Sequence, residues 1–258
     1  MLITGNAVLT LGTTQSLDRE GALWFDLDAN RIKYSYLVGE WSVGGALINN
    51  RQDLAGAGTQ NAGLAFGGEY SGVLACTEEY DGSTWAAGGA LIEARRQLAG
   101  AGTQNAGLAF GGVAAPGTVA CTEEYDGSSW STGGALIDAR NNLAGAGTQN
   151  AGLAFSTSTE EYNGSSWSAG GGMINGRSAL AGAGTQNSAL AFGGAPSPSA
   201  SCTEEYNGSS WVAGGALITG RRHLAGTGIQ NAGLAFGGQS NGTCTEEYNP
   251  ATVCIGTL

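Results

Sequence analysis

The sequence predicts an all-β protein folded as a β-propeller, and three observations carry this prediction. A unit of similar sequence recurs along the chain, and the Tyr that ends its TEEY segment returns at spacings of 45, 37, 44 and 42 residues. Turn-forming dipeptides divide each unit into runs of four to eight residues, which suit strands and are too short for helices of useful length. The residue types also change from small to aromatic along each unit, as the inner and outer strands of a blade require.

The repeat is nearly identical in successive units. The segment LAGAGTQNAGLAFGG occupies residues 54–68 and 98–112, and close copies occupy 143–155, 180–194 and 224–238. Each copy is followed by TEEY, which ends at Tyr80, Tyr125, Tyr162, Tyr206 and Tyr248. A Trp stands five residues after the Tyr, at Trp85, Trp130, Trp167 and Trp211, with Val253 in the last unit. Helical repeats and propeller blades share periods of this length, and the Gly-rich turns favour blades.

Four strands are expected in each unit, here named a to d. Strand a is LAGAGT (54–59), strand b is GLAFGG (63–68), strand c is CTEEY (76–80), and strand d surrounds the Trp, as in SSWSTGG (128–134). The D-G and N-G dipeptides between strands c and d are strong hairpin signals, because both turn residues tolerate positive φ. Small side chains in strand a suit an innermost strand, and the aromatic side chains of the other strands suit the wider spaces between blades.

This order of residues resembles the kelch repeat, whose marks are a double Gly at the end of the second strand and then a Tyr and a Trp. Gly67-Gly68, Tyr80 and Trp85 match these marks, and the second and fourth units match them equally well. The third unit departs from the pattern, because Phe155 runs directly into STSTEEY and the double Gly is lost. The resemblance implies one β-propeller domain over residues 1–258, with five kelch-like repeats in 41–258.

Residues 1–40 decide the number of blades. ALWFDLD (22–28), RIKYSY (31–36) and Trp41 follow the order of strands b, c and d, and LITGNAVLTL (2–11) is a candidate for strand a. The sequence therefore favours six four-stranded blades, of which the N-terminal one has diverged. The alternative, five blades preceded by an N-terminal arm, stays open at this point.

Composition argues against several classes of partner. The net charge is −11, so the surface repels the phosphates of nucleic acid and of an anionic membrane. We expect no membrane insertion and no secretory leader, because the apolar run at the N-terminus is short and lacks a cationic start. Four Cys (Cys76, Cys121, Cys202 and Cys244) share one phase of the repeat, which keeps them too far apart for disulfides. We expect buried free thiols, no metal site and no cofactor.

Recurring charged residues are expected to serve the scaffold. An Arg precedes strand a in every unit, at Arg51, Arg95, Arg140, Arg177 and Arg221, and strand c carries a pair of adjacent Glu residues. Strand alternation points the two carboxylates to opposite faces, so one of each pair is predicted to meet the Arg in an ion pair. A glycosidase needs two carboxyls in one cleft, whereas these pairs recur in every unit. His223 is the sole His and the other units carry unrelated residues at its position, so no catalytic residue is predicted.

Candidate binding residues lie in the segments whose sequence differs from one unit to the next. The a–b and c–d turns are nearly the same in all units and are expected on one face, whereas the b–c loops differ and are expected on the opposite face with the d–a connections. Variable loops on a rigid scaffold are typical of binding sites, although loops under no constraint also vary. The candidates are Glu69, Tyr70 and Ser71; Val113, Pro116 and Thr118; Pro196, Ser197 and Pro198; and Gln239, Ser240 and Asn241.

The segment GALWFDLDANRIKYSY and the near-identity of the units resemble virion proteins of marine tailed phages. That resemblance implies a non-enzymatic tail fibre, baseplate or decoration subunit, assembled in the host cytoplasm and residing in the virion. Its partners would be other virion proteins and a glycan or protein of the host surface. Two alternatives remain open: a cytoplasmic kelch-type protein-interaction scaffold and, third, a propeller glycosidase or lyase. Neither the ligand nor the oligomeric state follows from the sequence.

Overall fold

The computed structural model describes residues 23–26, 31–34, 43–196, 199–239 and 243–249, and the statements below refer to these residues. The chain divides into two compact units, residues 1–43 and 44–258. In the first unit, β1 (Leu23–Asp26) and β2 (Arg31–Tyr34) form an antiparallel hairpin in which Leu23 pairs with Tyr34. This hairpin confirms the two strands expected there, and the rest of residues 1–42 lies outside the described residues.

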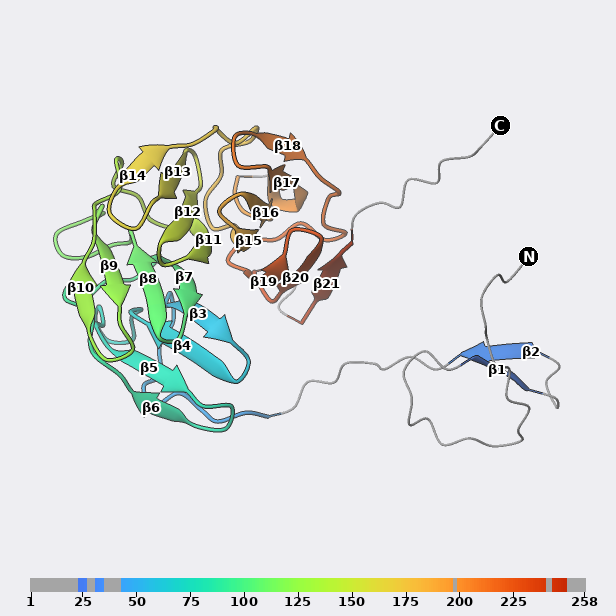
Figure 1. Cartoon of the computed structure of the whole chain (residues 1–258), viewed down its shortest axis with the longest axis horizontal. Helices are drawn as coiled ribbons and strands as arrows, with labels where there is room; N and C mark the ends of the chain where they lie inside the picture. The colour runs from blue at the N-terminus through green and yellow to red at the C-terminus, as the bar shows by residue number, and fades with distance from the viewer. Residues whose placement is uncertain (1–22, 27–30, 35–42, 197–198, 240–242, 250–258) are drawn as a thin grey trace. The chain divides into compact units, whose positions relative to one another are not determined.

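The second unit is a β-propeller of five antiparallel blades arranged round an axis (Figure 1). Blade 1 consists of β3 (Ala55–Thr59), β4 (Ala62–Phe66), β5 (Thr77–Tyr80) and β6 (Trp85–Ala87). Blade 2 consists of β7 (Ala99–Thr103), β8 (Ala106–Phe110), β9 (Thr122–Tyr125) and β10 (Trp130–Thr132). Blade 3 consists of β11 (Ala144–Thr148), β12 (Ala151–Phe155), β13 (Thr159–Tyr162) and β14 (Trp167–Ala169).

Blade 4 consists of β15 (Ala181–Thr185), β16 (Ser188–Phe192), β17 (Thr203–Tyr206) and β18 (Trp211–Ala213), with a short 3-10 helix at Ser199–Ser201. Blade 5 shows β19 (Ala225–Ile229), β20 (Ala232–Phe236) and β21 (Thr245–Tyr248), and the segment expected to form its strand d lies outside the described residues. Every repeat thus forms a blade with the predicted strand order, which confirms the fold class. The six-blade arrangement stays a prediction.

The innermost strands of neighbouring blades approach so closely that only Gly fits at one position. A Cβ on Gly145 would lie 2.6 Å from the Gly100 carbonyl oxygen and 2.7 Å from Phe110 Cζ. The same approach joins Gly100 to Gly56 and Gly182 to Gly145. The inner strands converge on the axis, and this explains why strand a carries small residues, as the sequence indicated.

Aromatic side chains fill the spaces between blades, as predicted. Trp130 of blade 2 packs against Phe66 of blade 1 with ring centroids 5.0 Å apart, and its indole N–H donates to Thr77 Oγ1 at 2.9 Å. Trp167 and Trp211 repeat both contacts at the next two junctions. The hydrogen bond satisfies the polar edge of an otherwise buried indole, so each Trp joins two blades without leaving an unpaired donor.

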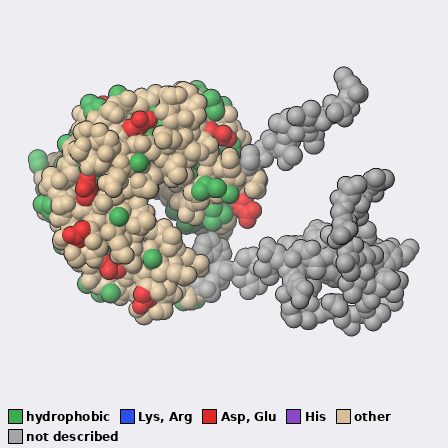
Figure 2. Space-filling model, viewed as in Figure 1, with side chains coloured by type: hydrophobic (Ala, Val, Ile, Leu, Met, Phe, Trp, Pro, Cys, Tyr) green, Lys and Arg blue, Asp and Glu red, His purple; other side chains and the backbone are tan. Residues whose placement is uncertain are grey.

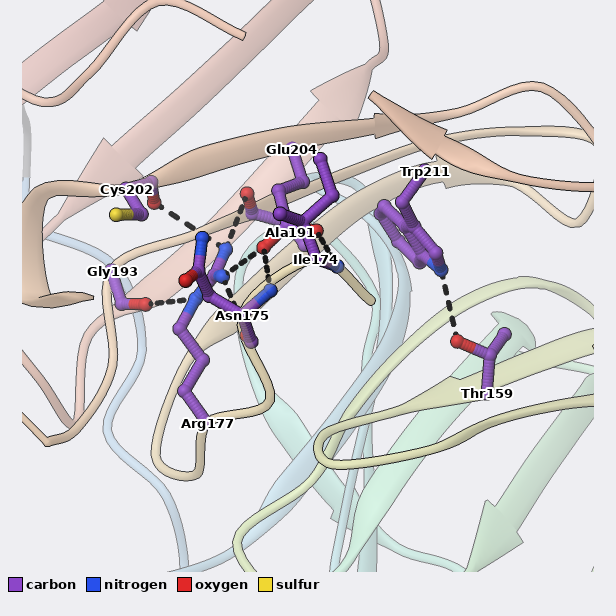
Figure 3. A network of polar contacts seen from close by, with 9 residues as sticks. All are labelled: Thr159, Ile174, Asn175, Arg177, Ala191, Gly193, Cys202, Glu204 and Trp211. Carbon is purple, nitrogen blue, oxygen red and sulfur yellow. Dashed lines mark hydrogen bonds and ion pairs between the residues drawn. The ribbon is translucent and has the colours of Figure 1, made fainter. Parts of the chain in front are cut away.

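Each blade also contains a buried ion pair between the repeated Arg and the first Glu of strand c, which confirms the predicted pairing. Arg177 meets Glu204 in this way, and the Glu204 carboxylate accepts the backbone N–H groups of Ile174 and Asn175 (Figure 3). The corresponding pairs are Arg51 with Glu78, Arg95 with Glu123, Arg140 with Glu160 and Arg221 with Glu246. The first Glu therefore fixes the d–a connection to its blade.

The second Glu of strand c points to the neighbouring blade. Tyr125 of blade 2 donates its hydroxyl to Glu79 of blade 1 at 2.5 Å, and Tyr162 donates to Glu124 at 2.5 Å. Burial, and then the hydrogen bond to the carboxylate, raise the pKa of Tyr125, Tyr162 and Tyr206 to about 12. The pKa of Tyr248 is raised for the same reasons.

The raised pKa values of these Tyr residues predict how the stability of the protein changes at alkaline pH. The folded protein favours the neutral form of each Tyr hydroxyl, whereas a Tyr of the unfolded chain ionises near pH 10. The contribution of these hydroxyls to the free energy of unfolding is therefore complete below about pH 10. It is lost as pH rises from about 10 to 12, where we expect the urea midpoint of unfolding to fall steadily. Tyr162→Phe should make that fall shallower. A midpoint that stays constant from pH 9 to pH 12 would contradict the proposed linkage.

Candidate binding face

The b–c loops and the d–a connections share one face of the second unit, as predicted. The first residue of a loop pairs with the connection beside it in isolated antiparallel bridges: Glu69 with Gln52, Val113 with Arg96, Ala195 with Ser178, and Gln239 with Arg222. On the other face, the c–d turn packs against the a–b turn, since a Cβ on Gly82 would lie 3.4 Å from Asn61 Oδ1. The variable loops therefore gather on one side, which we call the loop face.

Beside these bridges, one residue in each unit has a left-handed backbone conformation, and it lies directly before the Leu that begins strand a. Asp53, Gln97, Asn142, Ala179 and His223 have φ between 52° and 55°, and we call these five residues the collar. A left-handed conformation is uncommon for residues other than Gly and indicates a backbone that its surroundings hold in place. Here the surroundings are the neighbouring blades.

Backbone hydrogen bonds link the collar from blade to blade. The N–H of Gln97 donates to the Asp53 carbonyl at 2.8 Å, that of Asn142 to Gln97 at 2.9 Å, and the series continues through Ala179 to His223. The side chains differ in every blade, although the backbone is the same. Gln97 Nε2 donates to Asp53 Oδ2 at 3.0 Å, and Gln97 Oε1 accepts from Asn142 Nδ2 at 3.3 Å. The collar thus carries carboxylate, amide, methyl and imidazole groups in sequence on a fixed frame.

The structure places the predicted site residues on this face, in different situations. Tyr70 and Ser71 are exposed, and so are Pro116, Thr118, Pro196 and Gln239. Glu69 is half-buried and forms an ion pair at 2.8 Å with Arg96, so it links the loop of blade 1 to the connection entering blade 2. Val113 is half-buried and bridges to both Arg96 and Thr118, which makes it a loop anchor. Ser197, Pro198, Ser240 and Asn241 lie outside the described residues.

An exposed apolar side chain also recurs in every connection on this face. Ile48, Ile92, Ile137, Ile174 and Ile218 each donate a backbone N–H to the first Glu of strand c, while their side chains face solvent. The loop face therefore combines apolar side chains, polar collar residues and loops of varied sequence. Figure 2 shows the molecule from one side, with acidic side chains spaced round the ring.

Reactive groups are few among the described residues. No group of three or more His, Cys, Asp or Glu residues is placed there to hold a metal ion. The four described Cys are free and half-buried, not fully buried as predicted, because they lie where the b–c loop enters strand c. Burial raises the pKa of Cys121 to about 12, so its reactive thiolate is suppressed at neutral pH. In the described part of the chain, no helix is long and apolar enough to span a membrane.

Sequence reasoning missed the collar as a unit. His223 is exposed, and the sequence gives no sign of its left-handed backbone or of the hydrogen-bonded series to which it belongs. Asn and Asp tolerate this conformation, whereas Gln97 and Ala179 give no local sign of it. The sequence feature that could have pointed to the collar is a single position of the repeat at which the residue type differs in every unit while the neighbouring positions stay nearly constant.

No family model matches the chain, and no curated protein matches it.

Proposed function

We propose that this protein is a non-enzymatic binding module that recognises its partner through the loop face. One observation carries the proposal: variation among nearly identical repeats is concentrated in the b–c loops and the collar, which share one face. A rigid scaffold that presents varied loops is the usual construction of a recognition surface. The buried ion pairs and inter-blade tyrosines supply the rigidity.

We assign the module to a tailed-phage virion, where it would contact other virion proteins and a host-surface glycan or protein. The sequence GALWFDLDANRIKYSY supports this setting through its resemblance to phage tail and fibre segments, and its two central strands form a hairpin. Among the described residues, the first Glu of each pair meets an Arg, and the second Glu of blades 1 to 4 accepts the Tyr hydroxyl of the next blade. This argues for binding and against glycoside hydrolysis, which needs carboxyls of unequal environment in one cleft.

Exchange of one loop tests the proposal. Replacing residues 111–121 with Ser-Thr-Ser reproduces the connection of the third unit, where Ser-Thr-Ser joins Phe155 to Thr159, and it removes exposed Pro116 and Thr118. We expect binding to intact candidate host cells or to a printed glycan array to fall at least about tenfold, as for loss of an interface hot spot. Surface plasmon resonance or flow cytometry with the labelled chain measures this.

The matched control is Asp126→Asn on the opposite face. Asp126 Oδ1 accepts the N–H groups of Ser128 and Ser129, and Asn163 already makes the equivalent turn in blade 3. Binding should be unchanged by this substitution. If both variants lose binding equally, or if the loop exchange causes no loss of binding, the loop face is not the binding site. Turnover of a glycan by the wild-type protein would refute the non-enzymatic assignment.

A further inference from the structure

The Arg side chains of the second unit are unevenly distributed between its core and its surface. Residues 44–258 contain seven Arg and no Lys, and five of these Arg form the buried ion pairs with the first Glu of strand c. The other two are Arg96 and Arg222, which lie in the connections entering blades 2 and 5. The Arg side chains that this unit presents at its surface therefore both lie on the loop face.

Arg96 and Arg222 occupy the same position of the repeat, but their surroundings differ in charge. Arg96 forms an ion pair at 2.8 Å with Glu69, the residue that follows the double Gly of blade 1. The residue that follows the double Gly of blade 4 is Ala195, so no carboxylate corresponds to Glu69 beside Arg222. The Arg222 Nε–H donates to Gln239 Oε1 at 2.9 Å, and within the described residues this guanidinium forms no ion pair. Its positive charge is uncompensated there.

The acidic residues of the b–c loops and d–a connections all belong to blades 1 to 3. They are Asp53, Glu69, Glu93 and Asp138. By sequence, the connections entering blades 4 and 5 (170–180 and 214–224) and the b–c loops of these blades (193–202 and 237–244) contain no Asp or Glu. Although the net charge of the chain is −11, the loops and connections of blades 4 and 5 therefore offer an anion the positive charge of Arg222 without a competing carboxylate.

The backbone holds Arg222 in a defined position on this face. Arg222 pairs with Gln239 in an antiparallel bridge, in which the Gln239 N–H donates to the Arg222 carbonyl at 2.9 Å. The next residue, His223, has a φ of 52° and donates its N–H to the Ala179 carbonyl of blade 4 at 2.9 Å. Both side chains are exposed. Because Gln239 engages only Nε, the two terminal nitrogens of Arg222 keep the paired N–H groups that match the two oxygens of a carboxylate.

We propose that Arg222 binds the carboxylate of an acidic glycan on the loop face. This inference rests on the proposed function, because it names the class of ligand that the same face takes. The positions around Arg222 carry short or polar side chains, namely Ser178, Ala179, His223 and Gln239. Amide, hydroxyl and imidazole groups form hydrogen bonds with the hydroxyl groups of a sugar, whereas a protein partner would call for a pocket that receives a large aromatic or apolar anchor.

Two matched variants of the full chain test the inference. Arg222→Gln removes the uncompensated charge, and the fold already places Gln at the equivalent position of blade 1, Gln52. Surface plasmon resonance measures binding to uronic-acid and sialic-acid glycans, each in its native form and after reduction of its carboxyl groups to alcohols. We expect the wild-type protein to bind the native forms at least about tenfold more tightly than the reduced forms, and Arg222→Gln to lose this preference, as for loss of a hydrogen bond to a charged group. Arg96→Gln is the control and should keep the preference, because Glu69 already neutralises Arg96.

A second variant tests the charge without removing Arg222. Ala195→Glu places at blade 4 the residue that blade 1 has at Glu69, so a carboxylate becomes available to pair with Arg222 as Glu69 pairs with Arg96. We expect this substitution to lower binding of the native glycans by at least about tenfold as well, through competition for the same guanidinium. Equal urea midpoints of the variants and the wild type show that the losses do not come from unfolding.

The remaining outcomes would overturn the inference and are distinguishable from failure of the proposed function. Equal binding of native and reduced glycans by the wild type, binding of neither, or binding only of sulfated glycans or acidic peptides would exclude a carboxylated glycan as the ligand. Loss of binding on exchange of residues 111–121, with full binding retained by Arg222→Gln, would overturn this inference alone and keep the loop face as the site. Full binding retained by both of these variants would overturn the proposed function too.

Discussion

Glu123→Ala should destabilise the protein by about 3–5 kcal/mol, because it leaves a buried guanidinium without its counter-charge. The Arg95 side chain is fully buried, and Glu123 is its ion-pair partner. The same carboxylate accepts the backbone N–H of Ile92 at 2.7 Å, so the substitution also releases the connection that leads from blade 1 to blade 2. Urea denaturation followed by circular dichroism measures the loss.

A half-exposed pair provides the matched control for this result. Glu69→Ala removes the partner of Arg96, whose side chain is 34% exposed, and solvent screening limits the expected change to about 1 kcal/mol. The double variant Arg95→Met with Glu123→Leu should be less destabilised than Glu123→Ala, since no unpaired charge remains buried. Similar losses for Glu69→Ala and Glu123→Ala would show that the buried pair has no special role.

Gly145→Ala should destabilise the protein by about 3 kcal/mol, the upper range for a group forced into a filled core. The new methyl would meet the Gly100 carbonyl oxygen at 2.6 Å and Phe110 Cζ at 2.7 Å, so both the inner strand and the Phe of blade 2 must move. Backbone on one side and a buried ring on the other leave little room for relaxation. The thermal midpoint and the urea midpoint should both fall.

Gly172→Ala is the control for this substitution. Gly172 follows strand d of blade 3, has no positive φ, and an added Cβ there would have no neighbour within 4 Å. Its replacement should leave stability unchanged or raise it slightly, because Ala restricts the unfolded chain more than Gly does. A large loss at Gly172 together with no loss at Gly145 would contradict close packing at the axis.

The propeller could be predicted from the sequence, because each strand boundary coincides with local turn chemistry that repeats in every unit. The small residues of strand a, the N-G and D-G turns and the spacing of Tyr80 and Trp85 all describe contacts within a blade or between successive blades. The Arg–Glu pairing also followed from strand alternation, since adjacent Glu78 and Glu79 must face opposite ways. Periodic, local information was sufficient for these features.

Features that depend on how whole blades meet became apparent from the folded structure and could not be predicted beforehand. Left-handed φ at Gln97 and Ala179 accompanies hydrogen bonds to collar residues of the neighbouring blades, far away in the sequence, and neither residue type favours it locally. Contacts between blades are not encoded in any one unit, so the sequence predicted the blades while the assembled propeller revealed the collar.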